Sequence, residues 1–268
     1  MLRLFFLFAF SLLLLTSCTK VPLTNRSQLN FVSEDVMAEM SLTTYEEYIR
    51  SHPAVSSSDS AAVLVNRVGK KIAAAVEEFL HKQGMEERLK FFSWEFSLVS
   101  DTLKNAWCLP GGKVVVYTGL LPVTGGEEGL AVVMGHEIAH AVAMHGSERM
   151  SQSLLTQAGT LLLSYILGDG GGTTSILNDA FGVASQLGIM LPYSRKNETE
   201  ADRLGLIFMS MAGYDPGVAV DFWSRMKESS NMDVPELLST HPDDEKRIED
   251  IKSFLPEARQ YFSSVKPI

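Results

Sequence analysis

The stretch VVMGHEIAHAVAMH, Val132 to His145, places three histidines and one glutamate in an otherwise apolar run. Burying a polar or charged side chain is costly unless the group is paired or binds a metal. Residues four apart on an α-helix are separated by about 40° around its axis, so His136 and His140 project from one face. Glu137 is turned from His136 by about 100° and lies beside that pair. The stretch therefore predicts a helix that carries a metal site.

The spacing His-Glu-x-x-His is the arrangement in which two imidazoles bind zinc and the glutamate serves as general base of a metalloprotease. His136 and His140 are the predicted ligands, and Glu137 the predicted base. In one large class of zinc proteases a third histidine ligand follows the second by six residues, after a glycine turn. Here His145 follows His140 by five. On a continuing helix it would lie opposite His136, so we expect a packed or helix-capping histidine.

The third ligand is predicted on a second helix, in SRKNETEADRLG, residues 194–205. Glu198 and Asp202 are four apart and share a face, so Glu198 can bind zinc while Asp202 accepts a hydrogen bond from a zinc-bound histidine. The competing choice, Glu200, lies about 200° from that face, and four residues later the helix carries Leu204. The alternative for the segment is a solvated acidic face paired with Arg195, Lys196 and Arg203.

Composition bounds the class of protein. The chain has 268 residues, long enough for one sizeable core. With 46% hydrophobic and 21% charged residues, it has the composition of a folded globular protein. A formal net charge of −9 speaks against a nucleic-acid partner, which would require a basic face.

The first 17 residues, MLRLFFLFAFSLLLLTS, are almost entirely apolar. Arg3 precedes the apolar run and small residues lead to Cys18, the pattern of a secretory signal too short for a stable membrane span. The ending Leu-Thr-Ser-Cys resembles the bacterial lipobox, which predicts cleavage before Cys18 and a lipid on that residue. Ordinary signal-peptidase cleavage beside an incidental cysteine is the alternative. The only other cysteine, Cys108, is then a buried thiol or pairs with another chain.

The predicted organisation has three parts: a lipoprotein signal peptide (1–17), a lipidated tether (18–30) and one metallopeptidase domain (31–268). Thr19 rather than aspartate follows the cysteine, which resembles outer-membrane sorting. The predicted location is therefore the bacterial cell envelope, in the outer membrane and facing the periplasm, with the lipid at Cys18 as the membrane contact.

The pattern along the chain predicts an α+β fold, mostly helical with a small sheet. Strands are expected in FFSWEFSLVS (91–100) and at Val114–Val116, and a loop in GDGGGTTS (168–175). The segment 153–167 is too short for a membrane span and is expected as a buried or lid helix. The other expected helices are a short one within 29–50, then 60–84, 175–191, 197–212, 216–228 and 243–255.

Four segments together resemble peptidase family M48, the gluzincins that include the CAAX prenyl protease and bacterial membrane-stress proteases. They are NAWCLPGGKVVVYTGLL, HEIAHAVAMH, YSRKNETEADRLG and THPDDEKRIEDI, and the resemblance runs from about residue 25 to 255. It is strongest to lipoprotein forms that face the periplasm, and it implies a zincin-like fold with one zinc ion per chain. The implied site residues are the ligands His136, His140 and Glu198 and the base Glu137.

Two further roles follow from the resemblance alone. The strand formed by Lys113, Val114, Val115, Val116 and Tyr117 matches the one that pairs with the extended substrate in zincins; plain sheet structure is the alternative. His241 matches a family histidine near the zinc, which either steadies the oxyanion or occupies the fourth zinc position in a latent form. Tyr193 is a further candidate for steadying the oxyanion.

The sequence thus predicts a zinc endopeptidase that is anchored by lipid in the envelope and degrades misfolded or misassembled envelope proteins. Its partners would be protein or peptide substrates. The alternative is a holdase or assembly factor for outer-membrane proteins, with latent proteolysis and the outer-membrane assembly machinery as partner. Replacing Glu137 by glutamine separates the two, because only proteolysis needs that carboxylate.

Overall fold

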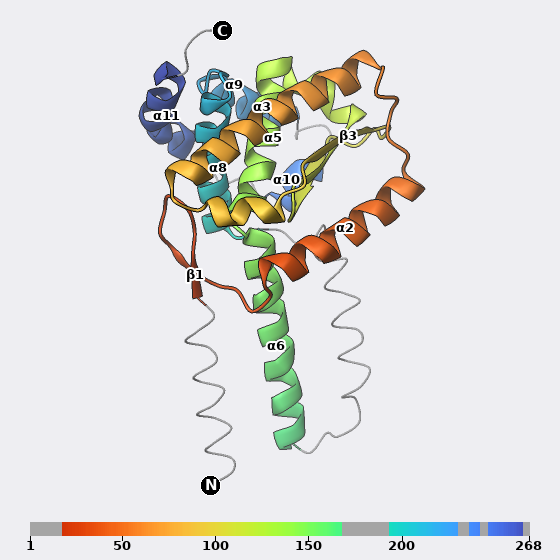
Figure 1. Ribbon diagram of the computed structural model, residues 1–268, viewed down its shortest axis with the longest axis vertical. Coiled ribbons are helices and arrows are strands. Elements are labelled where there is room, and N and C mark those ends of the chain that lie inside the picture. The colour runs from red at the N-terminus through yellow and green to blue at the C-terminus, as the bar shows by residue number, and fades with distance from the viewer. Residues whose placement is uncertain (1–17, 168–192, 230–235, 242–245, 265–268) are drawn as a thin grey trace.

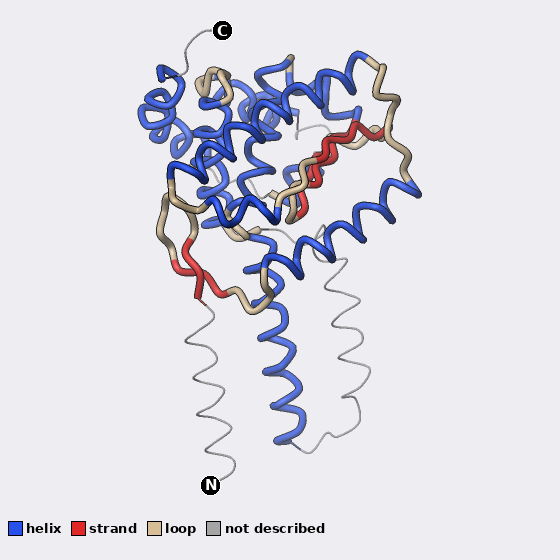
Figure 2. The backbone as a smooth tube through the Cα atoms, viewed as in Figure 1, coloured by secondary structure: helices blue, strands red, loops and turns tan. Residues whose placement is uncertain are grey.

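The computed structural model describes residues 18–167, 193–229, 236–241 and 246–264. The helices are α2 (Glu34–Ser51), α3 (Ser60–Lys82), α4 (Leu121–Thr124), α5 (Glu127–Val142), α6 (His145–Leu167), α8 (Arg195–Met211), α9 (Val218–Ser229), α10 (Glu236–Thr240) and α11 (Arg247–Ser264). The strands are β1 (Cys18–Lys20), β2 (Ser27–Leu29), β3 (Glu95–Val99), β4 (Ala106–Leu109) and β5 (Lys113–Tyr117), with 3-10 turns η1 (Glu86–Phe91) and η2 (Thr118–Leu120). The prediction of an α+β fold, mostly helical with a small sheet, is confirmed (Figure 2).

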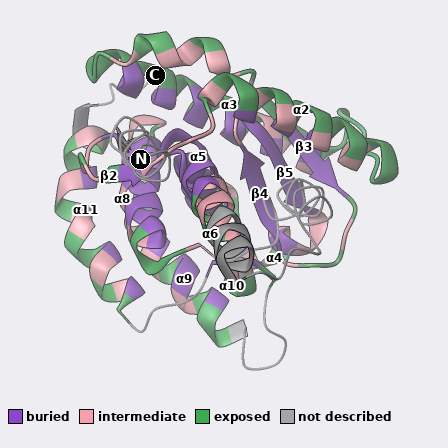
Figure 3. Ribbon diagram, turned by 90° about the horizontal axis from the view of Figure 1, so that it is seen from below, coloured by how far each residue is buried: buried purple, intermediate pink, exposed green. Residues whose placement is uncertain are grey.

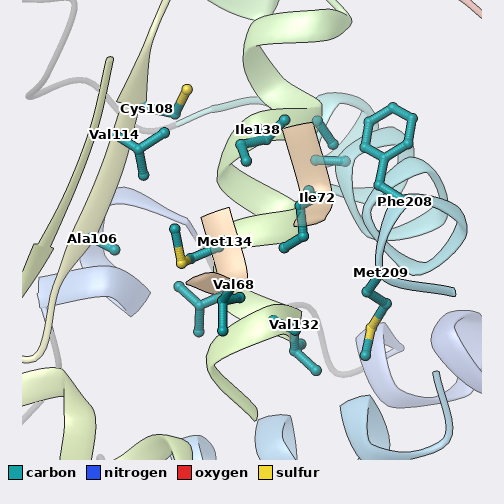
Figure 4. Close-up of a cluster of buried hydrophobic side chains, with 14 of the residues drawn as sticks. Val68, Ile72, Ala106, Cys108, Val114, Val132, Met134, Ile138, Phe208 and Met209 are labelled. Carbon is teal, nitrogen blue, oxygen red and sulfur yellow. The ribbon is translucent and has the colours of Figure 1, made fainter. Parts of the chain in front are cut away.

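Helix α5 is the centre of the molecule and lies between α8 and the sheet (Figure 3). Every residue from Gly129 to Val142 is buried, which explains why the stretch is apolar on all sides. The side chains around it form one core (Figure 4), with members Val132, Met134 and Ile138 of α5, Val68 and Ile72 of α3, and Phe208 and Met209 of α8.

The three-stranded sheet has the order β3-β5-β4. Strand β5 pairs in parallel with β3 and antiparallel with β4. Gly111 and Gly112 connect β4 to β5 with φ of 87° and 84°, backbone angles that favour glycine. The sequence predicted β3 and β5 but missed β4. Strand β5 is also buried along its whole length, but its run of valines marks it. The sequence Ala-Trp-Cys-Leu of β4 has neither an alternating pattern nor a β-branched residue.

Several helices differ in length from the prediction. Helix α3 begins at Ser60 as expected, where the Asp59 carboxylate accepts hydrogen bonds from two backbone N–H groups of the first turn. Helix α2 has 18 residues, where only a short helix was expected, and α11 continues past Pro256 to Ser264. The loop expected at 168–175 and the helix expected at 175–191 lie outside the described residues. None of the described helices combines the length and apolar character needed to cross a membrane.

Residues 18–30, the N-terminal arm, are packed on the body rather than forming a free tether. Strands β1 and β2 pair antiparallel, with Cys18 opposite Leu29. Val21, in the loop between them, is fully buried. The Gln28 side chain donates a hydrogen bond to the Ala143 carbonyl at 2.9 Å, just after α5. The arm therefore packs on the body, beside the N-terminal part of helix α6 (Figure 1).

Candidate active site

Two glycines allow the helices that carry the predicted metal ligands to approach closely. A Cβ on Gly135 of α5 would lie 2.9 Å from the Gly205 carbonyl oxygen of α8, and a Cβ on Gly205 would lie 2.9 Å from the His136 backbone nitrogen. Because no side chain separates the two backbones here, Glu198 of α8 reaches the α5 histidines.

Four side chains bring one donor atom each to a common point. The Nε2 atoms of His136 and His140 are 3.1 Å apart, and His241 Nδ1 is 3.2 Å from His136 Nε2. Glu198 Oε1 lies 3.1 Å from His241 Nδ1 and 3.5 Å from His140 Nε2. All four residues are between 1% and 4% exposed, and the four ligand atoms lie within 4.8 Å of one another.

This donor set fits a zinc ion. Tetrahedral zinc with bonds of about 2.0–2.1 Å places neighbouring donor atoms about 3.3 Å apart, and imidazole nitrogen and carboxylate oxygen are its usual ligands. Within the described part of the chain, no hydrogen bond reaches Glu198 Oε2 or Glu137 Oε1, although both oxygens are buried. A buried carboxylate oxygen without a hydrogen bond is costly, and a cation at the common point would satisfy that of Glu198. The protein is therefore built to hold one zinc ion.

A second carboxylate of α8 holds the outer side of His136. Asp202 Oδ1 lies 2.9 Å from His136 Nδ1, and the Arg247 guanidinium of α11 donates to both Asp202 oxygens at 2.8 and 2.9 Å. Burial by itself would raise the pKa of Asp202, but Arg247 and His136 hold it below its ordinary value. An ionised Asp202 can accept the Nδ1 proton of His136, which directs the Nε2 lone pair toward the donor set.

Arg247 is a site residue that the sequence analysis did not single out. It lies in the quoted segment THPDDEKRIEDI, and its guanidinium carbon is 3.4 Å from the centre of the Trp223 ring. A basic residue among several acidic ones gave no signal of its own, because a surface ion pair would have the same pattern.

Glu137 lies beside the donors, as its position on the helix requires. It is 2% exposed, and its Oε1 is 3.3 Å from His241 Nε2. Burial raises the pKa of Glu137 above its ordinary value, opposed by His241 and His136. A raised pKa suits a carboxylate that accepts a proton near neutral pH.

His145 does not lie opposite His136, because the helix does not continue. Helix α5 ends at Val142, Met144 has a φ of 57°, and α6 begins at His145. His145 is fully buried and outside the donor set, as expected for a packed histidine. Its Nδ1 is 3.0 Å from His140 Nδ1.

Tyr193 covers the metal site from the segment before α8. Its ring stacks on His140 with the ring centroids 3.9 Å apart. Its hydroxyl accepts a hydrogen bond from Arg149 at 3.4 Å. The contact with His140 is made by the ring face, so the structure shows a packing role for this tyrosine.

The prediction that Lys113–Tyr117 pairs with substrate is wrong. This strand, β5, is the middle strand of the sheet: Val114 pairs with Phe96 of β3 on one side and with Cys108 of β4 on the other. Both of its edges are occupied, so no peptide backbone can be added there. The error arose because the sequence analysis missed β4, which is the edge strand of the sheet next to α5 (Figure 3).

Comparison with known proteins gives a family match over most of the chain. The model of "Peptidase family M48" matches residues 66–255. The mitochondrial metalloendopeptidase OMA1 of Schizosaccharomyces pombe is 36% identical over 243 residues, 89% of this chain and 67% of the relative. The Saccharomyces cerevisiae protein of the same name is 30% identical over 94% of this chain and 73% of its own length. A putative beta-barrel assembly-enhancing protease of Vibrio cholerae is 32% identical over 62% of this chain and 35% of its own length.

These matches correct the predicted location. The two yeast relatives, 36% identical over 89% of this chain and 30% identical over 94% of it, are mitochondrial proteins. The match to the bacterial protein covers only 62% of this chain. An outer-membrane lipoprotein facing a bacterial periplasm is therefore the wrong assignment. Its main support was a short leader pattern, and residues 1–17 lie outside the described residues. The structure does not test the lipid on Cys18, which stays a prediction.

Proposed function

The chain belongs to peptidase family M48, and from that premise we propose that it cuts misfolded or misassembled proteins at a membrane. It is a zinc metalloendopeptidase with a site for one zinc ion. The observation that carries the proposal is the buried donor set of His136, His140 and Glu198 with Glu137 beside it.

Each residue of the site has its own role in the proposed reaction. A bound zinc ion supplies Lewis-acid chemistry, which polarises the scissile carbonyl and makes the nucleophilic water more acidic. Glu137 accepts the proton of the attacking water and delivers it to the leaving amine. Asp202, held by Arg247, fixes the orientation and the protonated nitrogen of His136. The closed, buried setting of these side chains strengthens each electrostatic contact.

The arrangement of His241 supports a latent state. Its Nδ1 lies among the donor atoms, 3.1 Å from Glu198 Oε1, while its Nε2 lies 3.3 Å from Glu137 Oε1. In this position the imidazole would supply a fourth ligand to a bound zinc ion, and it also contacts the proposed base. Zinc sites with four protein ligands are structural, whereas catalysis needs an open position. Activation would then require His241 to move away.

Strand β4 is our candidate for pairing with the substrate backbone, in place of β5. It is an edge strand of the sheet, whose order is β3-β5-β4, and it packs beside α5. An extended peptide added to a sheet edge gains main-chain hydrogen bonds that do not depend on its sequence. Such binding suits a protease whose substrates share a misfolded state rather than a sequence.

A second candidate function is to assist the assembly of membrane proteins, with proteolysis held latent. The similarity to the Vibrio cholerae protein, whose name describes an assembly-enhancing protease, favours it. The two functions differ in their need for the base, because holding or delivering a protein requires no proton transfer.

The test compares Glu137→Gln with the wild type, each also in a His241→Ala background that removes the proposed latency ligand. Cleavage of unfolded casein should disappear with Glu137→Gln in both backgrounds, while zinc content and melting temperature stay at the parent's values. Glu128→Gln, an exposed position on the same helix, is the matched control and should cleave normally. Undiminished cleavage by Glu137→Gln would falsify the assigned base.

Proteins trapped by Glu137→Gln in cells and identified by mass spectrometry then test the substrate class. Enrichment of misfolded membrane-associated proteins supports the degradative function. The second candidate predicts that cells lacking the protein assemble their membrane proteins poorly. If Glu137→Gln fully restores that assembly, the second candidate function is favoured instead.

A further inference from the structure

A chain of buried hydrogen bonds leads away from the outer side of His140. His140 Nδ1 and His145 Nδ1 are 3.0 Å apart, and His145 Nε2 is 3.2 Å from Glu200 Oε2. His140 presents its Nε2 to the other donors, so a neutral His140 carries its proton on Nδ1. His145 must then accept at Nδ1 and donate from Nε2 to Glu200. Geometry therefore fixes the direction of every bond in the chain.

The N-terminal arm holds the carboxylate at the end of this chain. Arg26 Nε donates to Glu200 Oε2 at 2.8 Å, and the Thr24 hydroxyl donates to Glu200 Oε1 at 2.6 Å. The other two nitrogens of the Arg26 guanidinium donate to both oxygens of Glu148 at 2.6 and 2.7 Å. Both Glu200 oxygens therefore accept hydrogen bonds from the arm, and Oε2 also faces His145 Nε2.

The two metal histidines of α5 are supported in parallel ways from opposite ends of the chain. His136 is held by Asp202, which Arg247 of α11 clamps. On the side of His140 the α8 carboxylate is Glu200, and His145 bridges the distance between them. The break of the helix at Met144 is what brings His145 into that place.

We propose that His145 and Glu200, with Arg26 of the N-terminal arm, are positioning residues for the metal ligand His140. They fix which nitrogen of His140 carries the proton and how its ring is oriented, and so raise the affinity of the site for zinc. The inference rests on the zinc-ligand role of His140 within the proposed function. It also makes the arm part of the metal site, because Arg26 acts through Glu200.

The test measures the dissociation constant of zinc by competition with a chromogenic chelator. His145→Leu removes the acceptor for His140 Nδ1 and should weaken zinc binding by about 10–100-fold, the usual effect of losing such a partner. His145→Asn keeps an acceptor oxygen near the place of Nδ1 and should bind within a few-fold of the wild type. Arg26→Ala should weaken binding less than His145→Leu. Arg203→Ala is the control, because Arg203 lies on α8 but pairs with Glu257 away from the site. This variant should bind zinc with the dissociation constant of the wild type.

The melting temperature of the zinc-free variants separates positioning from folding. If His145→Leu and His145→Asn lose zinc affinity equally, or neither loses any, the proposal is overturned. If His145→Leu fails to fold, Glu200→Leu against Glu200→Gln gives the same comparison, because glutamine still accepts from His145. Wild-type protein that binds zinc yet cleaves nothing would contradict the proposed function and leave this inference standing.

Discussion

Gly135 of α5 lies against Gly205 of α8, so that a Cβ on Gly135 would stand 2.9 Å from the carbonyl oxygen of Gly205. Real Cβ atoms hardly ever approach a backbone oxygen so closely, and backbone cannot move aside as a flexible side chain can. The metal site depends on this contact, because Glu198 on α8 must reach His136 on α5.

Gly205→Ala should therefore destabilise the protein by about 1–3 kcal/mol through overpacking, despite the better helix propensity of alanine. Zinc affinity should fall as well, since the helices must separate. Thermal unfolding and zinc titration measure the two effects. Gly146→Ala is the control: within the described part of the chain, its Cβ would meet the Pro110 ring at 3.6 Å, an ordinary contact distance. Equal stability of the two variants would contradict the close-contact argument.

Purified protein should carry about one zinc per chain, and Glu198→Ala should lose it, because its carboxylate is the predicted third ligand. Asp202→Asn should bind zinc about 10–100-fold more weakly, since it removes only the group that orients His136. Metal analysis after dialysis against a graded chelator checks both. Zinc retained by Glu198→Ala as firmly as by wild type would mean that the third ligand is another residue.

His241→Ala should increase the cleavage of unfolded casein, because it opens the fourth ligand position and frees Glu137. The opposite role makes the opposite prediction: a residue that stabilises the oxyanion would, when removed, lower kcat by on the order of 10²-fold. Initial rates at equal zinc loading decide between them. An unchanged rate would dismiss both roles.

Acid should weaken the zinc-free protein partly through Glu148. Burial opposes ionisation, but Arg26 and Asn197 hold the pKa of Glu148 below its ordinary value, which is about 4.3. Because the folded-state pKa is depressed, this stabilisation is complete above the unfolded-state pKa and is lost as pH falls through the folded-state pKa. Glu148→Gln should therefore be less stable than wild type at pH 6, and the difference should shrink below about pH 4.3. Urea unfolding at both pH values measures it; a constant difference would argue against an ionic contribution.

The sequence was sufficient where helical periodicity alone sets the geometry. His136 and His140 share a face of α5, and Glu198 and Asp202 share a face of α8, because each pair is four residues apart. The meeting of the two helices left only a faint signal, the glycines at 135 and 205, because glycine serves many purposes in a helix.

The remaining parts come from long-range contacts or from unmarked backbone features. Arg247 lies 111 residues from His136 in the sequence, and Arg26 lies 122 residues from Glu148, so local patterns could not connect them. Met144 adopts a left-handed backbone without being glycine, and nothing in its side chain predicts that. Strand β4 is buried along its whole length and, unlike β5, has no β-branched residue to reveal it. The membrane of residence was inferred from the apolar leader, the lipobox-like ending at Cys18 and the following Thr19, a pattern too short to fix an organelle.

The order of the site residues along the chain has a consequence for synthesis. A ribosome releases His136 first, then Glu198, and His241 only 43 residues after Glu198. Arg247, which clamps Asp202, emerges after His241. His241, the proposed latency ligand, is thus synthesised before Arg247, the last residue that the site needs to hold Asp202 and His136 in place. If His241 is the latency ligand, a growing chain never presents a site that is both open and complete, and proteins near the ribosome should escape cleavage while the protease is being made.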